Sequence, residues 1–284
     1  MNIAVASGKG GTGKTLVSTN LFHALQKRGV TVILVDCDAE EPNVMEFIQG
    51  ETFASNVVTQ NIPVIDTPKC TFCGKCYEYC NYNAILYLQP SKYIQVVEDL
   101  CHDCGACSVA CLYGAITEKP KTVGKVDSVY LSCHSQLIEG CAEVGVYSPV
   151  PVIKRAIKEA QANTLNIFDS PPGISCPFIA TVDKADYVIL VTEPTPFGLN
   201  DLKLSIETLQ QIGKPFGVVV NRSTLGNSDV YNYLEQNSFT LLMEIPFDKE
   251  IARIYSEGKM LVDEKPEYQE RFIALYQLVK KQIQ

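Results

Sequence analysis

The stretch "SGKGGTGKT", residues 7–15, constrains the fold most, because a glycine-rich loop of this kind works between a strand and a helix. Residues 8–15 fit G-x-x-x-x-G-K-[ST], with the strand-like "NIAVAS" before them and the amphipathic "TLVSTNLFHALQKRG" after them. Backbone N–H groups of such a loop curl around phosphates, and the helix N-terminus adds a positive dipole end. The sequence therefore predicts a nucleotide site lined by Gly8, Gly10, Gly11, Thr12, Gly13, Lys14 and Thr15.

Two residues of this loop have specific expected roles. Lys14 is expected to reach the β- and γ-phosphates, and Thr15 to ligate Mg²⁺. ATP and Mg²⁺ are therefore the expected cofactors. A second lysine, Lys9, also lies within the phosphate loop, and the motif alone does not account for it.

Apolar, β-branched runs alternate with helical stretches over most of the chain: "NIAVAS", "VTVILVD", "NIFDS", "YVILVTE", "FGVVVN" and "LLMEIP". Continuous apolar strands separated by helices are typical of a parallel sheet that is covered on both faces. The expected fold class is therefore α/β, a doubly wound and mostly parallel sheet of the P-loop NTPase kind. The amphipathic C-terminal "ERFIALYQLVKKQIQ" is expected to pack on this core rather than on a membrane.

The alternation stops in a cysteine-rich segment, residues 61–126, that repeats itself. "CTFCGKCYEYCNYNAI" and "CHDCGACSVACLYGAI" align at an offset of 31 residues. We interpret 61–126 as a small α+β domain inserted into a P-loop ATPase domain formed by 1–60 and 127–284.

Each repeat has the spacing C-x₂-C-x₂-C-x₃-C, which is typical of [4Fe–4S] ligands in bacterial two-cluster ferredoxins, where the fourth cysteine ligates the other cluster. Zinc is the weaker alternative, because its sites need no third nearby cysteine. Asn81 and Leu112 stand where those ferredoxins often have proline, which removes no ligand. The resemblance predicts crossed ligation by two sets, Cys70, Cys73, Cys76 and Cys111 for one cluster and Cys101, Cys104, Cys107 and Cys80 for the other.

Charge and hydropathy exclude several classes of function. The net charge is −8, so binding to nucleic acid through phosphate neutralisation is not expected. No uninterrupted apolar run reaches the ~18 residues of a membrane span, and the chain starts with a strand-like run rather than a leader. Cysteines at metal-ligand spacing beside a nucleotide loop favour a reducing cytoplasm.

The loop "KGGTGKT" resembles the deviant Walker A ATPases of the MinD/Mrp/nitrogenase-iron-protein class, whose loop reads KGGxGKT. That resemblance implies a homodimer, or a heterodimer with a paralogue, in which Lys9 crosses the interface to the partner's nucleotide. The alternative for Lys9 is a solvated loop lysine. The resemblance further implies roles for residues of "LVDCDAEEPN", "FDSPPG" and "VVVNR". Asp36 and Asp169 would support Mg²⁺, and Asp38 would orient the attacking water. The Gly173 amide would sense the γ-phosphate, and Asn221 would contact adenine or cap a strand end.

Four cysteines lie outside the two repeats: Cys37, Cys133, Cys141 and Cys176. Cys37 is expected to be a small core residue. "EGCAEVGV" resembles the nitrogenase iron protein segment GCAGRGV, which carries a cluster ligand, and Cys176 follows "DSPPG" as that family's second ligand does. The resemblance implies a third [4Fe–4S] cluster, bridging the dimer through Cys141 and Cys176. Two structural cysteines are the alternative, because Glu143 and Val144 replace Gly and Arg.

Together these features predict ATP hydrolysis that drives a conformational cycle. The leading interpretation is ATP-gated electron transfer through ferredoxin-type clusters to a redox partner protein. The alternatives are an iron–sulfur cluster carrier, although no cysteine follows Cys176 as in the Mrp-type ATPases, and a MinD-like regulatory or positioning ATPase whose clusters sense redox state. The insertion follows shortly after Asp38, so a rearrangement there on hydrolysis could move the clusters.

Overall fold

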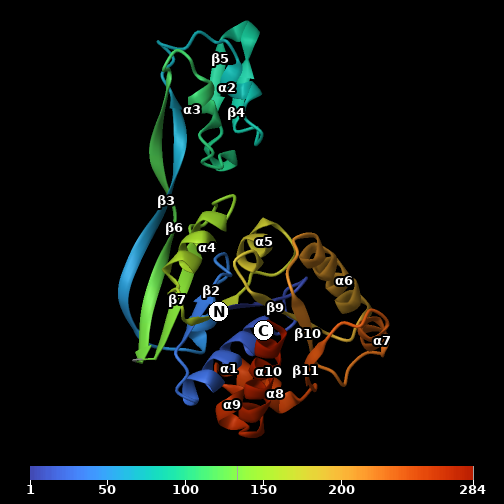
Figure 1. Cartoon of the computed structure of the whole chain (residues 1–284). Coiled ribbons are helices and arrows are strands. Elements are labelled where there is room, and N and C mark those ends of the chain that lie inside the picture. The colour runs from blue at the N-terminus through green and yellow to red at the C-terminus, as the bar shows by residue number, and fades with distance from the viewer. Residues whose placement is uncertain (133, 284) are drawn as a thin grey trace.

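The computed structural model describes residues 1–132 and 134–283. Within these residues, one sheet has nine strands in the order β11-β10-β9-β1-β8-β2-β7-β6-β3 (Figure 1). Its strands are β1 (Asn2–Ala6), β2 (Val32–Asp36), β3 (Glu51–Ile65), β6 (Ile116–Ser132), β7 (Ser135–Ala142), β8 (Leu165–Asp169), β9 (Tyr187–Thr192), β10 (Phe216–Asn221) and β11 (Leu241–Ile245).

The sheet is parallel from β11 to β7, and β6 and β3 are added to its edge as antiparallel strands. All six apolar runs of the sequence form strands of the parallel part. The prediction of a doubly wound, mostly parallel α/β sheet is therefore confirmed.

Two groups of helices cover the two faces of the sheet. Because successive side chains of a strand point to opposite faces, Ile3 and Val5 of β1 pack into one core, and Ala4 and Ala6 pack into the other. The first core contains α1 (Lys14–Lys27), α8 (Lys249–Ser256), α9 (Leu261–Glu264) and α10 (Glu267–Ile283), and the second contains α4 (Val150–Glu159), α5 (Cys176–Val182), α6 (Pro196–Gln211) and α7 (Asp229–Gln236).

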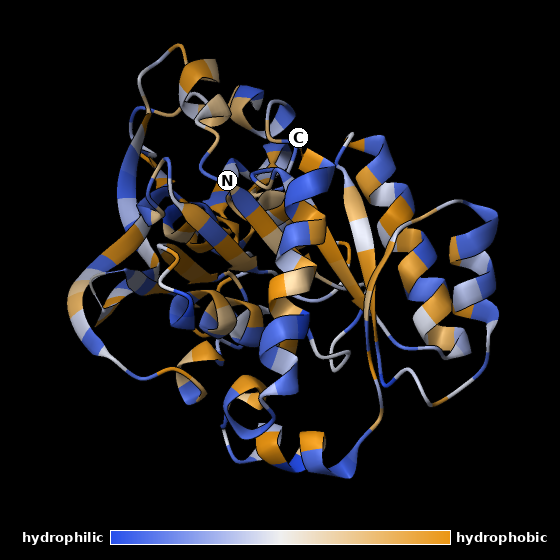
Figure 2. Cartoon of the chain, turned by 60° about the horizontal axis from the view of Figure 1, so that its bottom comes forward, coloured by the Kyte–Doolittle hydropathy of each residue, from blue (hydrophilic) through white to orange (hydrophobic). Residues whose placement is uncertain are grey.

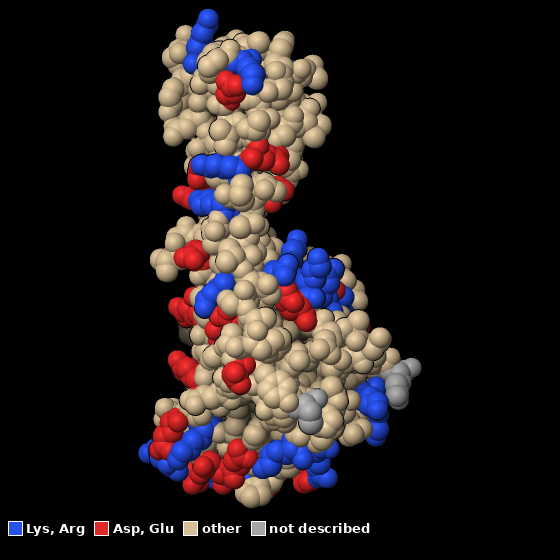
Figure 3. Space-filling model, turned by 90° about the vertical axis from the view of Figure 1, so that its left-hand side faces the viewer, with Lys and Arg blue, Asp and Glu red and all other residues tan. Residues whose placement is uncertain are grey.

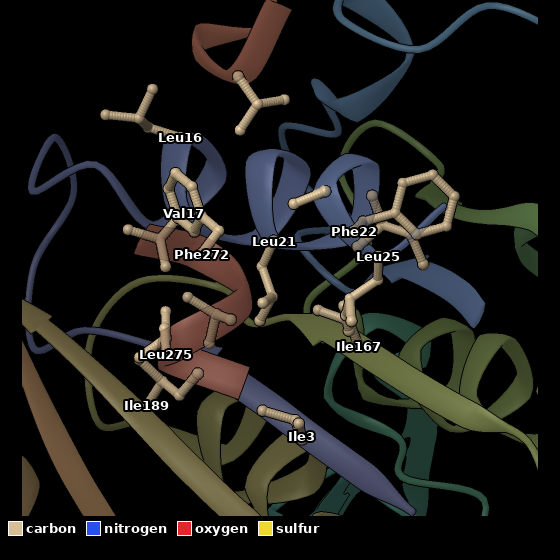
Figure 4. Close-up of a cluster of buried hydrophobic side chains, with 14 of the residues drawn as sticks. Ile3, Leu16, Val17, Leu21, Phe22, Leu25, Ile167, Ile189, Phe272 and Leu275 are labelled. Carbon is tan, nitrogen blue, oxygen red and sulfur yellow. The ribbon is translucent and has the colours of Figure 1, made fainter. Parts of the chain in front are cut away.

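The C-terminal helix α10 packs on the body of the protein, as the sequence predicts. Phe272, Leu275 and Val279 are buried, and the first two lie against α1 and the sheet in the close-up of Figure 4. Hydropathy alternates around the helices, with polar stripes turned outward (Figure 2). Among the described residues, none of the helices combines the length and the continuous apolar character that a bilayer crossing requires.

Strands β3 and β6 form a long antiparallel ribbon that leaves the sheet and carries the two cysteine repeats at its far end (Figure 1). Their register runs from Glu51 opposite Tyr130 to Ile65 opposite Ile116. The expected domain boundaries at residues 61 and 126 fall inside these two strands. The sheet and its covering helices are called the nucleotide-binding body below.

Residues 66–115, called the cysteine module below, form a small unit of short elements. These are α2 (Lys75–Glu78), the two-stranded sheet of β4 (Ile85–Leu88) and β5 (Tyr93–Val96), α3 (Ala106–Ala110) and the 3₁₀ turns η2 (Gln89–Ser91) and η3 (Glu98–Leu100). Another turn, η1 (Val44–Glu46), precedes the ribbon. Figure 3 shows charges of both signs side by side along the neck below the module, where Lys119 pairs with Glu98 at 2.9 Å and Lys121 with Asp99 at 2.7 Å.

Candidate functional site

The phosphate loop connects the end of β1 to the start of α1, so its N–H groups and the N-terminus of a helix of 14 residues share one concavity. Gly13 has φ 96°, a conformation that favours glycine, and a Cβ there would lie 2.3 Å from Nδ2 of Asn221. Lys14 and Thr15 begin α1, and both are buried.

Asp169, at the carboxyl end of β8, lies at the mouth of this loop. Its Oδ2 accepts a hydrogen bond from the Thr15 hydroxyl at 2.8 Å, and among the described residues nothing donates to its buried Oδ1. Burial raises the pKa of Asp169, and the Lys14 charge opposes that shift. A threonine hydroxyl beside a buried carboxylate oxygen without a donor fits the oxygen ligands that Mg²⁺ prefers.

The neighbouring strand β2 ends in Asp36, which shapes the loop that follows it. Oδ1 of Asp36 accepts from the Asp38 amide at 3.0 Å, and Oδ2 accepts from the amides of Asn43 and Val44 at 3.1 Å each. Burial, and then the nearby Asp169, raise the pKa of Asp36. The carboxylate thus holds residues 37–44 in place, and its support of Mg²⁺ stays a prediction.

Asp38 extends from the same loop toward the phosphate loop. Burial raises its pKa to about 6, while the positive charge of Lys14 opposes the rise. A carboxyl group with a pKa in this range is partly protonated near neutral pH and can exchange a proton with a bound water. The position is compatible with the expected role of Asp38 toward water.

Lys9 and Gly173 both make contacts within their own chain in this structure. Nζ of Lys9 lies 3.9 Å from Oε2 of Glu193, whose other oxygen accepts from Nη1 of Arg222 at 2.5 Å. The Gly173 amide donates to the Ser7 carbonyl at 3.1 Å. Lys9 must leave Glu193 to reach a partner's nucleotide, and Gly173 must leave Ser7 to contact a γ-phosphate. The roles of Lys9 and Gly173 toward nucleotide both stay predictions.

Asn221, at the end of β10, braces the phosphate loop. Its Nδ2 donates to the Thr12 carbonyl at 2.8 Å, and its Oδ1 accepts from the Arg222 amide at 2.9 Å. Its contact with adenine stays a prediction. Beside it opens a pocket of about 290 Å³ lined by Gly11, Gly13, Leu16, Asn221, Arg222, Pro246, Phe247, Asp248, Ile251, Ala252 and Tyr255.

The lining of this pocket suits a nucleotide base, because apolar and aromatic side chains dominate it next to the phosphate loop. Sequence reasoning missed its residues from α8 and the turn before it. The available signal was "EIPFDKEIARIY", an aromatic turn and an amphipathic helix that follow the last strand of the sheet.

The two halves of the cysteine module repeat the same backbone conformation at the offset of 31 residues. Left-handed residues occur in pairs: Phe72 with Asp103, Gly74 with Gly105 and Asn83 with Gly114. The Asp66 amide donates to the Ala115 carbonyl, and the Val97 amide to the Ala84 carbonyl, both at 2.8 Å. The sequence duplication is therefore also a structural duplication.

Two small hollows, of about 20 Å³ each, lie between these halves. Each is lined by three cysteines of one repeat and the fourth cysteine of the other. The Cys70 set consists of Cys70, Cys73, Cys76 and Cys111, and the Cys101 set of Cys101, Cys104, Cys107 and Cys80.

Backbone N–H groups point at the sulfur atoms in both hollows. The Ala84 amide donates to Sγ of Cys80, and the Ala115 amide to Sγ of Cys111, at 3.3 Å each. The Phe72 amide donates to Sγ of Cys70 at 3.4 Å. Hydrogen bonds of this kind stabilise thiolates that carry iron, so the residues present fit a cluster in each hollow.

Burial raises the pKa of several of these thiols, that of Cys76 to about 11, so without metal they stay protonated. In residues 1–132 and 134–283, no three Cys, His, Asp or Glu side chains converge as ligands of one metal ion. In a [4Fe–4S] cubane each of the four irons binds one cysteine. The four cysteines therefore surround the cluster and do not converge on a single metal ion.

The remaining cysteines are separate from these sets. Cys37 is fully buried, as expected for a core residue, and Cys133 lies outside the described residues. Cys141 is half-buried near the carboxyl end of β7, opposite Lys125 of β6, and burial raises its pKa. Cys176 is exposed at the first position of α5. Ligation of a bridging cluster by Cys141 and Cys176 stays a prediction.

Comparisons with known proteins place the nucleotide-binding body in a family. The description "CobQ/CobB/MinD/ParA nucleotide binding domain" matches residues 3–262. The uncharacterized proteins MJ0579 and MJ0578 of Methanocaldococcus jannaschii are 32% and 31% identical, over 91% and 99% of this chain and 90% and 97% of their own lengths.

Solved structures of similar fold, and short matches to other proteins, agree with this family assignment. The cell division ATPase MinD of Pyrococcus furiosus has a TM-score of 0.60 at 22% identity, covering 99% of this chain and 98% of its own, which is a likeness of fold. An iron-sulfur cluster carrier protein of Pyrococcus horikoshii is 50% identical over 46 residues, 16% of each chain. The chain therefore belongs to the CobQ/CobB/MinD/ParA family of nucleotide-binding P-loop proteins.

Proposed function

We propose that the chain is an ATPase that uses binding and hydrolysis of Mg·ATP to gate electron transfer through two [4Fe–4S] clusters in its cysteine module. It acts in the cytoplasm as a homodimer, or as a heterodimer with a related chain, and passes electrons to a redox partner protein. The observation that carries this proposal is the pair of hollows, each lined by four cysteines in the crossed arrangement.

The nucleotide half of the proposal rests on charge placement around the phosphate loop. Lys14 neutralises the β- and γ-phosphates, and Thr15 with Asp169 supplies oxygen atoms for the metal. Mg²⁺, when bound with ATP, neutralises charge that develops on the phosphate oxygens. Asp38 holds the attacking water, and its pKa of about 6 lets it accept a hydrogen bond at neutral pH.

The cluster half rests on the donors that the module supplies. Clusters, when bound, carry single electrons at potentials set by hydrogen bonds to sulfur and by solvent exposure. The amides of Ala84 and Ala115 donate to the fourth cysteine of each repeat, so the chain tunes both sites in the same way. Both sets must lose their thiol protons to bind iron, because the thiolate is the ligand.

A continuous stretch of chain joins the two halves. The Asp36 carboxylate fixes the amides of Asp38, Asn43 and Val44, and the turn η1 and the ribbon follow within a few residues. A change at the γ-phosphate that shifts Asp38 also shifts the base of the ribbon. This supports a coupling between nucleotide state and the position of the module.

The test is a redox titration of the anaerobic protein with ADP and with a non-hydrolysable ATP analogue. We expect the analogue to change either the potentials of the clusters or the rate of electron delivery to a dye acceptor. The Lys14→Ala variant, which cannot hold the phosphates, should show no such change. Identical potentials and rates with both nucleotides would reject gating.

Cluster transfer is a second candidate function, favoured by the short match to the carrier proteins of Pyrococcus species. A carrier would lose its iron to an apo-protein in an ATP-dependent way, whereas an electron-transfer protein would retain it. Incubation with an apo-ferredoxin, followed by separation of the two proteins, distinguishes these functions. If the protein proves to have no iron, the MinD-like regulatory function, consistent with the fold of the solved relatives, becomes the better account.

A further inference from the structure

The cysteine module contacts the nucleotide-binding body through three aromatic rings. The ring of Tyr82 stacks on that of His102, with centroids 3.9 Å apart and planes 14° from parallel. His102 in turn meets Tyr147 edge to face, with centroids 6.0 Å apart and planes at 73°. Tyr147 belongs to the loop of residues 143–149, which joins β7 to α4, so this contact spans the two parts of the chain.

A cleft of about 280 Å³ lies at this contact. Its lining combines the module and the ribbon with the loop 143–149 and the start of α4: Gln60, Tyr82, Asp99, Cys101, His102, Lys121, Val123, Val146, Tyr147, Ser148, Val150, Pro151 and Lys154. Cys101 belongs to the Cys101 set. No cysteine of the Cys70 set is in this lining. The Cys101 set is therefore the one next to the body.

The same half of the module is also fastened to the ribbon. Nε2 of Gln60 donates to the Cys101 carbonyl at 3.3 Å, and the Asn61 amide donates to Oδ2 of Asp103 at 2.8 Å. Lys121 and Lys119 pair with Asp99 and Glu98 just before these residues. At the position of His102, the other repeat has Thr71, which provides no ring to stack. A duplicated module is thus attached to the body asymmetrically.

Tyr147 is not a core residue of the body. It is 64% exposed with the module in place, so its ring contributes little to the core, and among the described residues its aromatic contact is the one with His102. The loop that presents it is fixed at its start, where the Glu143 amide donates to the Val123 carbonyl at 2.9 Å. The loop begins two residues after Cys141, at the end of β7, so the ring joins the module to the edge of the sheet where the nucleotide site lies.

We propose that Tyr147 is a positioning residue that docks the Cys101 set against the body through His102 and Tyr82. The Cys101 set is then the inner site of the module, and the Cys70 set is the outer site that a redox partner meets. The assignment of inner and outer clusters rests on the proposed function, whereas the docking contact concerns the chain alone. Two measurements separate these parts.

Hydrogen exchange tests the docking. In Tyr147→Ala, the amides of residues 80–84 and 101–105 should exchange about three- to tenfold faster, the range expected when one aromatic contact is lost. The amides of 70–76 should keep their rates, and Tyr147→Phe, which keeps the ring, should resemble the parent. Tyr113→Ala, the equivalent of Tyr82 in the other repeat, should leave 101–105 unchanged. Unchanged rates at 101–105 in Tyr147→Ala, or equal acceleration in both halves, would overturn the proposal.

Iron release tests the assignment of the inner site. Cys73→Ser should leave the Cys101 set as the intact site, and Cys104→Ser should leave the Cys70 set. Adding Tyr147→Ala should speed loss of iron to a chelator several-fold in the Cys73→Ser protein and leave the Cys104→Ser protein unaffected. Equal effects in both backgrounds would refute an inner site. If the parent protein binds no iron, the proposed function fails, and hydrogen exchange alone still decides the docking.

Discussion

At the scale of single residues, the nucleotide site depends on a buried carboxylate that the fold leaves partly unsatisfied. Oδ2 of the Asp169 carboxylate accepts a hydrogen bond from the Thr15 hydroxyl, and the structure places no donor from the described residues at Oδ1. An unpaired buried acceptor costs about 1–3 kcal/mol. A divalent cation bound beside Thr15 would remove that cost, which supports the expected Mg²⁺ role of Thr15 and Asp169.

The two lysines of the phosphate loop should be separable by mutation. Lys14→Ala should abolish ATP hydrolysis and weaken ATP binding, because the phosphates lose the buried cation that begins α1. Lys9→Ala should lower hydrolysis about a thousandfold or more, the effect of losing a charge that stabilises the transition state, and leave ATP binding largely intact. Phosphate release and equilibrium nucleotide binding measure the two effects. Turnover at the parental rate by the Lys9 variant would show that Lys9 is a solvated loop residue.

At the scale of elements, charged side chains hold α9 against α1. Asp263 lies 2.9 Å from Nε2 of His23 and 2.8 Å from Nζ of Lys27. Partial burial opposes ionisation of Asp263, but the hydrogen bond from Lys27 and the charge of His23 outweigh it, so its pKa is lowered. The contribution of this ion pair to stability is therefore present above the unfolded pKa of about 3.9 and is lost as the pH falls through the lower folded pKa.

Asp263→Asn tests this contact. At pH 7 the substitution should lower the free energy of unfolding by ~0.5–1 kcal/mol, since the pair is half exposed and screened by solvent. The difference from the parent should shrink as the pH falls from 5 to 3. Urea unfolding of metal-free protein measures both values. A difference that grows toward low pH would contradict the ion-pair explanation.

The cysteine module offers a matched pair of substitutions for crossed ligation. Cys111→Ser should damage the cluster at Cys70, Cys73 and Cys76, because Cys111 lines that hollow, and should leave the other cluster nearly normal. Cys80→Ser should have the mirror-image effect. Electron paramagnetic resonance of the reduced proteins follows each cluster. If Cys111→Ser removed the signal of the cluster at its own repeat instead, ligation would not be crossed.

At the scale of the whole molecule, a cluster between two subunits is the most demanding expectation. Cys141 and Cys176 both lie near the carboxyl ends of the parallel strands, the edge that also carries the nucleotide site. If they bridge a dimer, iron should approach about twenty atoms per dimer, from five cubanes of roughly four irons each. Cys176→Ala should lower that figure to about sixteen with the module's signals unchanged. Equal iron in both proteins would make the two cysteines structural.

The parallel strands β1, β2, β8, β9, β10 and β11 could be predicted because each is a continuous apolar run. Strands β3 and β6 could not, since they leave the body as an exposed, largely polar ribbon with no long continuous apolar run. Strand β7 could not either, because Glu139 and Gly140 interrupt its short apolar run. The phosphate loop and the cysteine repeats each occupy a short stretch of sequence, so both could be predicted from the sequence alone. The contact of Lys9 with Glu193 and the pocket beside α8 join residues far apart in the chain, and no short pattern records them.

The proposed function depends most on whether the two hollows hold clusters. The most direct measurement is the iron and acid-labile sulfide content of anaerobically purified protein, alongside its zinc content. Two cubanes in the module predict about eight iron and eight sulfide per chain, or about ten of each if a bridging cluster is shared between two chains. Zinc in place of iron, or less than about one iron per chain after anaerobic reconstitution, would contradict the central claim.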